Sequence, residues 1–383
     1  MDKIKLVVTS TFGLEAVIKR ELQALGFDQF HVVDGRIEFD ATCADIPRLN
    51  LHLRTADRVL VKVGEFPATD FGELFDRTKE LPWEDWIPRD AKLTVVGKCV
   101  RSVLESVRSS QSIAHKAVIE RLKSKFHIEW LPETGPEVTI QVAILKDVAH
   151  LTLDTSGDGL HKRGYRVSTG EAPIRENLAS ALVQLSFWDK DRLLMDPMCG
   201  SGTILIEAAM LARQIAPGLN RTFASEYWPV VKKSFWDDAR SKARAMIKPS
   251  GGLKILGYDI DPERIKDARV NAKKAGVGDD IVFECKDFKD LWIHEPYGIV
   301  ISNPPYGVKI GSLKELTPIY ITMHHMFKNK EGWSLYILTA DDRFPDFFKR
   351  AKPDKTRKLF NGAIEVNYYQ YYGKRPREEK MSA

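Results

Sequence analysis

One stretch, from Arg192 to Ala212, constrains the fold of this chain more than any other; it reads RLLMDPMCGSGTILIEAAMLA. Leu193 to Met195 form a short apolar run typical of a buried parallel strand, and Asp196-Pro197 ends it. Gly200-Ser201-Gly202 then turns the backbone, and Thr203 opens an amphipathic helix. A strand, a glycine turn and a helix N-terminus in this order bring main-chain N–H groups against a bound ligand. The stretch therefore predicts a cofactor-binding loop.

The loop also restricts which cofactor it can hold. A dinucleotide fingerprint requires a third glycine where this chain has Leu205, and a phosphate-binding P-loop requires a lysine where it has Thr203. An acidic residue at the start of the loop, Asp196, suits a ligand with an ammonium group, because a carboxylate accepts its hydrogen bonds. S-adenosylmethionine is such a ligand. The alternative is a glycine turn that serves packing only.

Composition sets the outer limits. At 383 residues the chain is long enough for two or three domains, and 43% hydrophobic with 29% charged residues is ordinary for a soluble globular protein. No apolar run approaches the about 18 residues of a membrane helix, so we expect a cytoplasmic protein without membrane contact. Its 4 cysteines form no C-x-x-C pair, which argues for free thiols and against zinc.

The N-terminal part alternates short strands and helices. Residues 1 to about 60 predict a small α+β unit of ferredoxin-like type. A second unit, from about 66 to 154, predicts a strand over 92–99, a helix from Ser112 to Phe126, and strands over 138–144 and 148–153. Neither pattern specifies a function.

Basic residues gather in this second unit. Between Ala91 and Trp130 eight Lys and Arg stand against three Glu, an excess that could bind a phosphate backbone or could be a solvated helix face. The connector from Asp154 to Arg166 adds further cations and one stacking ring, Tyr165. The residues predicted to contact nucleic acid are Lys98, Arg101, Lys116, Lys162, Arg163 and Arg166.

An aromatic insertion follows the cofactor loop, over about 217–252. Its Tyr227, Trp228, Phe235 and Trp236 could stack on bases, but such residues more often pack an insertion against its host, and we favour packing.

Beyond the insertion, strands and helices alternate in a pattern that predicts a parallel sheet wound on both faces, with ligands at the carboxyl ends of its strands. Polar residues follow four successive strands. Asp259 suits a ribose diol, and Asp287 with Phe288 suits an adenine. The predicted cofactor-binding residues are Asp196, Pro197, Gly200, Ser201, Gly202, Thr203, Asp259, Ile260, Asp287 and Phe288.

The fourth strand end carries the catalytic candidates, Asn303, Pro304, Pro305 and Tyr306. An exocyclic amine on a base is a poor nucleophile, because its lone pair is delocalised into the ring. Hydrogen bonds to the Asn303 amide oxygen and the Pro304 carbonyl would localise that pair and direct it at a methyl group. The prolines hold these oxygens rigidly, and Tyr306 can stack on a base turned out of its helix.

These motifs resemble a known family. Residues from Arg166 to Tyr372 resemble amino-group methyltransferases that carry a D-P-x-C-G-S-G-T loop and an N-P-P-Y motif, here Asp196 to Thr203 and Asn303 to Tyr306. The N-terminal part is similar to the ferredoxin-like and THUMP arrangement of RNA guanine methyltransferases. The resemblance implies a ferredoxin-like domain over 1–64, a THUMP RNA-binding domain over 65–155, and a Rossmann-like class I methyltransferase domain over 156–383.

The activity implied by the resemblance is S-adenosylmethionine-dependent methylation of the position-2 amine of a guanine in RNA, with 23S rRNA favoured as the substrate. A tRNA guanine methyltransferase with the same modules is the nearest alternative. An adenine-N6 DNA methyltransferase and a non-catalytic RNA-binding protein are further ones. No metal is expected, and the sequence leaves the oligomeric state open.

Overall fold

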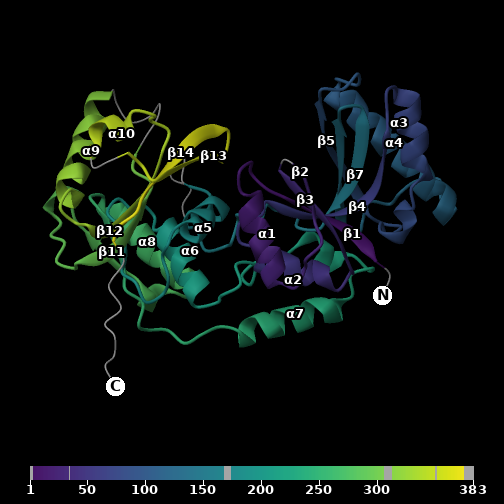
Figure 1. The fold of residues 1–383 in the computed structure, drawn as a ribbon. Coiled ribbons are helices and arrows are strands. Elements are labelled where there is room, and N and C mark those ends of the chain that lie inside the picture. Colours follow the sequence, from purple (N-terminus) through teal and green to yellow (C-terminus); the bar gives the residue numbers. More distant parts are fainter. Residues whose placement is uncertain (1–2, 34, 168–173, 306–312, 350–351, 375–383) are drawn as a thin grey trace. The chain divides into compact units, whose positions relative to one another are not determined.

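A computed structural model describes residues 3–33, 35–167, 174–305, 313–349 and 352–374. The chain divides into two compact units, each built on a seven-stranded sheet (Figure 1). The first unit comprises Met1–Ser10, Ile18–Leu160 and Arg221–Ala243. The second comprises Thr11–Val17, His161–Asn220 and Arg244–Ala383. None of the described helices is both long and apolar enough to cross a membrane.

The first sheet runs through both of the N-terminal modules that the sequence suggests, in the order β2-β3-β1-β4-β7-β6-β5. Pairing of β4 with β7, for example Val61 with Leu153, joins the two halves. Its strands are β1 (Ile4–Thr9), β2 (His31–Val33), β3 (Arg36–Ala41), β4 (Arg58–Pro67), β5 (Lys92–Val100), β6 (Glu137–Leu145) and β7 (Val148–Asp154). Its helices are α1 (Glu15–Ala24), α2 (Asp45–His52), α3 (Phe71–Glu80) and α4 (Val107–Phe126).

Helix α4 shows how sequence determines this packing. Alternate residues of β6 are buried, and α4 buries a stripe of small and branched residues that includes Ala114 and Ala117. The helix begins at Val107, because the Ser106 hydroxyl accepts a hydrogen bond from the Ser109 amide at 3.2 Å. The predicted start at Ser112 is therefore wrong by more than a turn.

The central part of the aromatic insertion, Arg221–Ala243, belongs to the first unit and not to the second unit, whose sequence it interrupts. Phe223 stacks on Trp236 of α7 (Lys233–Ala245) with ring centroids 5.1 Å apart, and Trp228 is also buried. Ser225 donates to the Thr155 carbonyl through both its amide and its hydroxyl. Packing therefore accounts for both tryptophans, as expected, although the host differs from the expected one. Tyr227 is 64% exposed.

The second sheet has the order β10-β9-β8-β11-β12-β14-β13, and its first five strands are parallel. They are β8 (Leu194–Asp196), β9 (Ile255–Asp259), β10 (Val282–Cys285), β11 (Tyr297–Ser302) and β12 (Gly332–Thr339). The antiparallel edge is formed by β13 (Lys355–Asn361) and β14 (Ile364–Tyr371). The helices are α5 (Glu176–Leu185), α6 (Thr203–Ala212), α8 (Pro262–Lys274), α9 (Leu313–Phe327) and α10 (Phe344–Phe347).

Helices cover both faces of this sheet. Ile299 and Ile301 of β11 lie in one apolar cluster with α5, α6 and α8, whereas Val300 lies in a second cluster with α9. This alternation is the expected signature of a sheet buried on both sides. The predicted doubly wound fold is confirmed.

Candidate active site

The polar residues at the four strand ends lie along one edge of the second sheet. Strands β10, β9, β8 and β11 are consecutive neighbours and run parallel, so their carboxyl ends meet at that edge. Asp196 ends β8, Asp259 ends β9, Asp287 follows β10 by two residues, and Asn303 follows β11 directly. The structure thus brings together the candidates that the sequence placed on separate strands.

The glycine turn is tied to the neighbouring strand. Gly200 and Gly202 have φ of 54° and 80°, a backbone conformation that favours glycine. A Cβ on Gly202 would lie 2.9 Å from the ring of Phe283, so the turn also needs glycine for space. The Gly200 amide donates to Oδ2 of Asp259 at 2.8 Å. Turn and carboxylate therefore form one rigid element at the start of α6.

Asp196 is buried beneath this turn, 2% exposed. Its Oδ1 accepts hydrogen bonds from the Ser302 hydroxyl at 2.7 Å and the Met198 amide at 3.1 Å. Burial raises the pKa of Asp196 to about 7, against the opposing effect of these two donors and with a smaller contribution from Asp259. A cation placed nearby would ionise the carboxyl group.

The second and third strand ends differ in how open they are. Asp259 Oδ1 accepts from the Asp261 amide, Asp261 caps α8, and Ile260 between them is 67% exposed. Asp287 caps a short 3-10 turn and pairs with Lys289 at 2.8 Å, and that hydrogen bond holds the pKa of Asp287 below its usual range. Phe288 is half-buried beside it. An apolar side chain and a fixed carboxylate are thus present where an adenine was predicted.

Asn303 has the most informative side chain of the site. Its amide oxygen is buried and, within the described part of the chain, accepts no hydrogen bond. A buried oxygen without a donor is rare in proteins and calls for an explanation, which a bound ligand supplies. Pro304 is buried and Pro305 half-buried next to it. Tyr306 lies outside the described residues.

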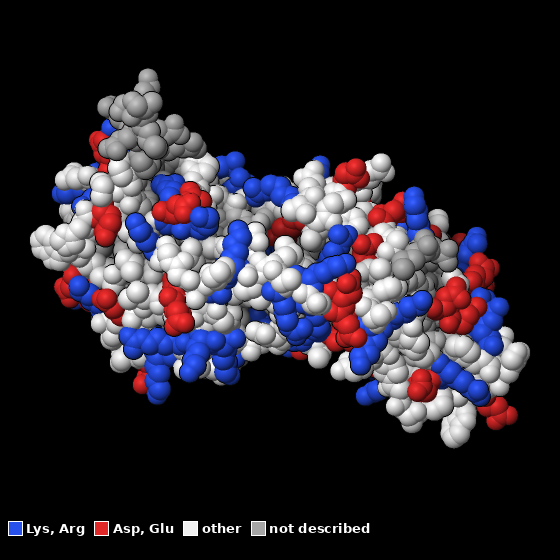
Figure 2. Space-filling model, turned by 90° about the horizontal axis from the view of Figure 1, so that it is seen from below, with Lys and Arg blue, Asp and Glu red and all other residues white. Residues whose placement is uncertain are grey.

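The predicted nucleic-acid contacts fall into two groups. Lys98, Arg101, Lys116 and Lys162 are exposed. Lys98 and Lys116 lie on opposite faces of the first sheet, because Gly97, next to Lys98, faces Gln111 of α4. Figure 2 shows Lys and Arg in part gathered in groups and in part interspersed with Asp and Glu on the face seen there. Lys98 and Lys116 therefore do not form one patch.

Arg163 and Arg166 require a correction. Arg163 is 2% exposed and lies 3.5 Å from the fully buried Glu207, to which the buried Tyr165 also donates a hydrogen bond. Arg166 is also largely buried and pairs with Glu176 at 2.8 Å. Neither arginine is free to contact an RNA backbone in this structure. The sequence signal that was missed is Glu207, an acid within the otherwise apolar helix α6.

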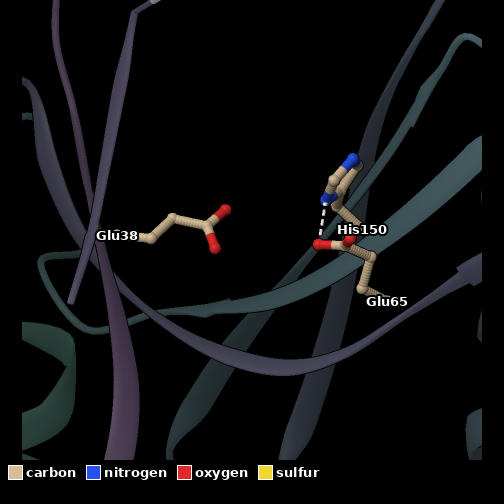
Figure 3. Close-up of side chains that lie close together, drawn as sticks. All are labelled: Glu38, Glu65 and His150. Atoms are coloured by element: carbon tan, nitrogen blue, oxygen red, sulfur yellow. Dashed lines mark ion pairs between the residues drawn. The ribbon is translucent and has the colours of Figure 1, made fainter. Parts of the chain in front are cut away.

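Glu38, Glu65 and His150 form a separate polar cluster in the first unit (Figure 3). His150 Nδ1 lies 3.0 Å from Glu65, and the Glu38 carboxylate points toward this pair. Such groups can bind a metal ion, but the Lys62 ammonium lies 2.7 Å from Glu38 and 2.5 Å from Glu65. Burial lowers the pKa of Lys62, but the two carboxylates outweigh this effect and raise the pKa above its usual value. The cluster therefore already contains its cation.

Comparison with known proteins identifies the family. A model described as the RMKL-like methyltransferase domain matches residues 163–370, more than half of the 383-residue chain. The chain belongs to this family. Models of the RlmL ferredoxin-like domain and of the THUMP domain match residues 5–60 and 68–154. The membership confirms the predicted methyltransferase fold and its S-adenosylmethionine cofactor.

Three relatives illustrate the family. The chain is 44% identical to the "Putative RNA methyltransferase YpsC" of Bacillus subtilis (strain 168), over 99% of both chains. It is 32% identical to the "Ribosomal RNA large subunit methyltransferase K/L" of Syntrophotalea carbinolica, over 96% of this chain but only 53% of that protein. The crystal structure of "SMU.472, a putative methyltransferase complexed with SAH" is 40% identical, with a TM-score of 0.92 over 98% of this chain and all of that one.

Proposed function

We propose that this methyltransferase modifies the position-2 amine of a guanine in RNA, with 23S rRNA as the first substrate to test. The observation that carries the proposal is the amide oxygen of Asn303, directly after β11, which is buried and accepts no hydrogen bond from the described residues. An oxygen in that state binds an N–H donor, and the exocyclic amine of a base is such a donor.

Different residues of the site would position the cofactor and the target amine. S-adenosylmethionine supplies an electrophilic methyl group on a positively charged sulfur. Gly200 to Thr203 and Asp259 would hold this cofactor, and the carboxyl of Asp196 would ionise close to its positive charge. Asn303 and the rigid Pro304 carbonyl would accept hydrogen bonds from the target amine and orient its lone pair. No side chain needs to remove a proton beforehand, because the amine becomes acidic as the methyl group is transferred.

An RNA substrate is supported by the N-terminal half and by the relatives' names. A THUMP domain is matched over residues 68–154, and two relatives are named as RNA or ribosomal RNA methyltransferases. We propose that residues 1–64 and 65–155 act together in recognising RNA and that residues 156–383 carry the chemistry. The exposed Lys98, Arg101, Lys116 and Lys162 remain proposed contacts.

Two other substrates would use the same catalytic motif. A tRNA guanine would fit the same modules, and an adenine amine in DNA would fit Asn303 equally well. The ribosomal relative favours rRNA, but this chain spans only about half of it. The substrate therefore has to be determined by experiment.

The deciding experiment is methyl transfer from labelled S-adenosylmethionine to unmodified 23S rRNA, total tRNA and duplex DNA. Each product is digested and its nucleosides are identified by mass spectrometry. We expect N2-methylguanosine in rRNA. N2-methylguanosine confined to tRNA would overturn the choice of RNA, and N6-methyladenine in DNA would overturn the choice of base.

A further inference from the structure

Arg166 has a buried donor that its protein partners leave unused. Nε donates to Glu176 at 2.8 Å, and Nη2 donates to the Ile174 carbonyl at 3.0 Å and the Thr203 hydroxyl at 3.2 Å. Nη1 is buried and has no hydrogen-bond partner among the described residues. An unsatisfied guanidinium nitrogen is costly to bury, so a ligand acceptor at this position would explain it.

The surroundings of Arg166 belong to the cofactor loop. Thr203 is the first residue of α6, and the N-cap, Gly202, offers no side chain to the first amides of that helix. Those amides and the helix dipole favour a negatively charged group. The Arg166 guanidinium, which contacts Thr203, adds a positive charge at the same helix end.

Asn271 of α8 bonds to the backbone of the glycine turn and to the backbone next to Arg166. Its Nδ2 donates to the Ser201 carbonyl at 3.2 Å, and its Oδ1 accepts from the Val167 amide at 2.9 Å. Asn271 is buried. The segment that carries Arg166 is therefore fastened directly to the glycine turn, and the guanidinium is held in place before any ligand arrives.

We propose that Arg166 binds the carboxylate of the methionyl group of S-adenosylmethionine through Nη1, with the N-terminus of α6 as the second donor. The proposal rests on the cofactor assignment and gives Arg166 a role in place of the RNA contact that the sequence suggested. Glu176 accepts the hydrogen bond from Nε of Arg166, which leaves Nη1 for the ligand.

The test is calorimetric binding of S-adenosylmethionine and of its decarboxylated form, which differs only in lacking the carboxylate. Wild-type protein is expected to prefer S-adenosylmethionine by about tenfold or more, as for a charged hydrogen bond. In Arg166→Met this preference is expected to shrink severalfold, whereas the exposed Arg175→Met, as matched control, keeps it.

Arg166→Lys serves if the methionine variant does not fold. A single ammonium cannot keep Glu176 and Thr203 and also reach the carboxylate, so the preference is expected to shrink here too. If Arg166 acts only on structure, its variants weaken both compounds by the same factor, and the proposal is overturned. Because no RNA is present, an error in the methyl acceptor leaves the result intact. Wild-type protein that bound neither compound would overturn the cofactor itself.

Discussion

The Gly200 amide donates to the Asp259 carboxylate over 2.8 Å, which joins the turn after β8 to the end of β9. One carboxylate thus orients the glycine turn and is also the predicted acceptor for a ribose diol. Loss of Asp259 should consequently affect the cofactor more than loss of a single contact would.

We expect Asp259→Ala to weaken S-adenosylmethionine binding by about 10- to 100-fold, the range for hydrogen bonds to a charged group. Asp259→Asn keeps an oxygen that can accept from the Gly200 amide, so its affinity for the cofactor should lie between those of the wild type and of Asp259→Ala. Isothermal titration with S-adenosylmethionine measures the affinity of all three proteins. Equal affinities for the asparagine and alanine variants would show that the bond to Gly200 contributes nothing.

Asn303→Ala is expected to lower the rate of methyl transfer at least about a hundredfold, because the target amine loses an acceptor that orients it. Cofactor affinity and thermal stability should stay close to wild type, since the oxygen has no partner in the described protein. Single-turnover rates with labelled cofactor provide the measurement. Asn220→Ala, at an exposed asparagine, is the control. Full activity in Asn303→Ala would falsify the proposed orientation of the amine.

Much of the fold could be predicted from local patterns, and the exceptions have physical causes. Strands such as β6 were predicted because one face is buried, so that apolar residues alternate. The start of α4 was missed because its first three residues, Val107 to Ser109, are not buried and carry no apolar repeat. The single sheet of the first unit depends on pairing of β4 with β7, which are distant in sequence.

The strand-end residues of the site were predictable for the same reason, because parallel topology alone brings them to one edge. The roles of Arg163 and Arg166 were not. Each depends on a carboxylate elsewhere in the chain, Glu207 and Glu176, and the sequence near the arginines suggests only a basic segment. Whether a cation is exposed depends on such partners, which the basic segment alone does not reveal.

The ammonium of Lys62 should exclude divalent metals from the cluster of Glu38, Glu65 and His150. We expect Zn²⁺ to leave the melting temperature of wild-type protein unchanged. Without metal, Lys62→Met should have a lower melting temperature, because two carboxylates lose their cation. Zn²⁺ should raise the melting temperature of this variant, by about 2–4 °C for each kcal/mol of binding free energy. Melting curves with Zn²⁺ or EDTA measure this. The gain should vanish in Lys62→Met/His150→Ala, and a Zn²⁺ effect on wild type would contradict the interpretation.

Arg163 should matter for stability and not for RNA contact. Arg163→Met leaves Glu207 buried without its cation, which costs about 3–5 kcal/mol of unfolding free energy. The exposed neighbour Lys162→Met should stay within about 0.5 kcal/mol. Denaturant titration measures both. The double variant Arg163→Met/Glu207→Gln should recover most of the lost unfolding free energy, because the uncompensated charge is gone. If Arg163→Met alone were as stable as wild type, the buried pair would be irrelevant to the fold.

The buried carboxyl of Asp196 makes stability depend on pH in a direction that can be worked out. Its pKa is about 7 in the folded chain against 3.8 without burial, so between these values the folded state binds more protons than the unfolded state. Stability from this group is therefore greatest at low pH and falls as pH rises toward 7, by at most about 1.4 kcal/mol per pH unit. Asp196→Asn, which stays neutral, should not show that decline.

Ser302 provides the sharper test of the same group. Its hydroxyl donates to Asp196 at 2.7 Å and stabilises the ionised form, so Ser302→Ala should raise the pKa further. The pH range over which stability falls should then extend above 7. Urea titrations of wild type, Ser302→Ala and Asp196→Asn at several pH values between 5 and 8.5 would reveal the difference. If all three follow parallel curves, Asp196 is ionised throughout, and the cofactor's positive charge meets a carboxylate that is already negative.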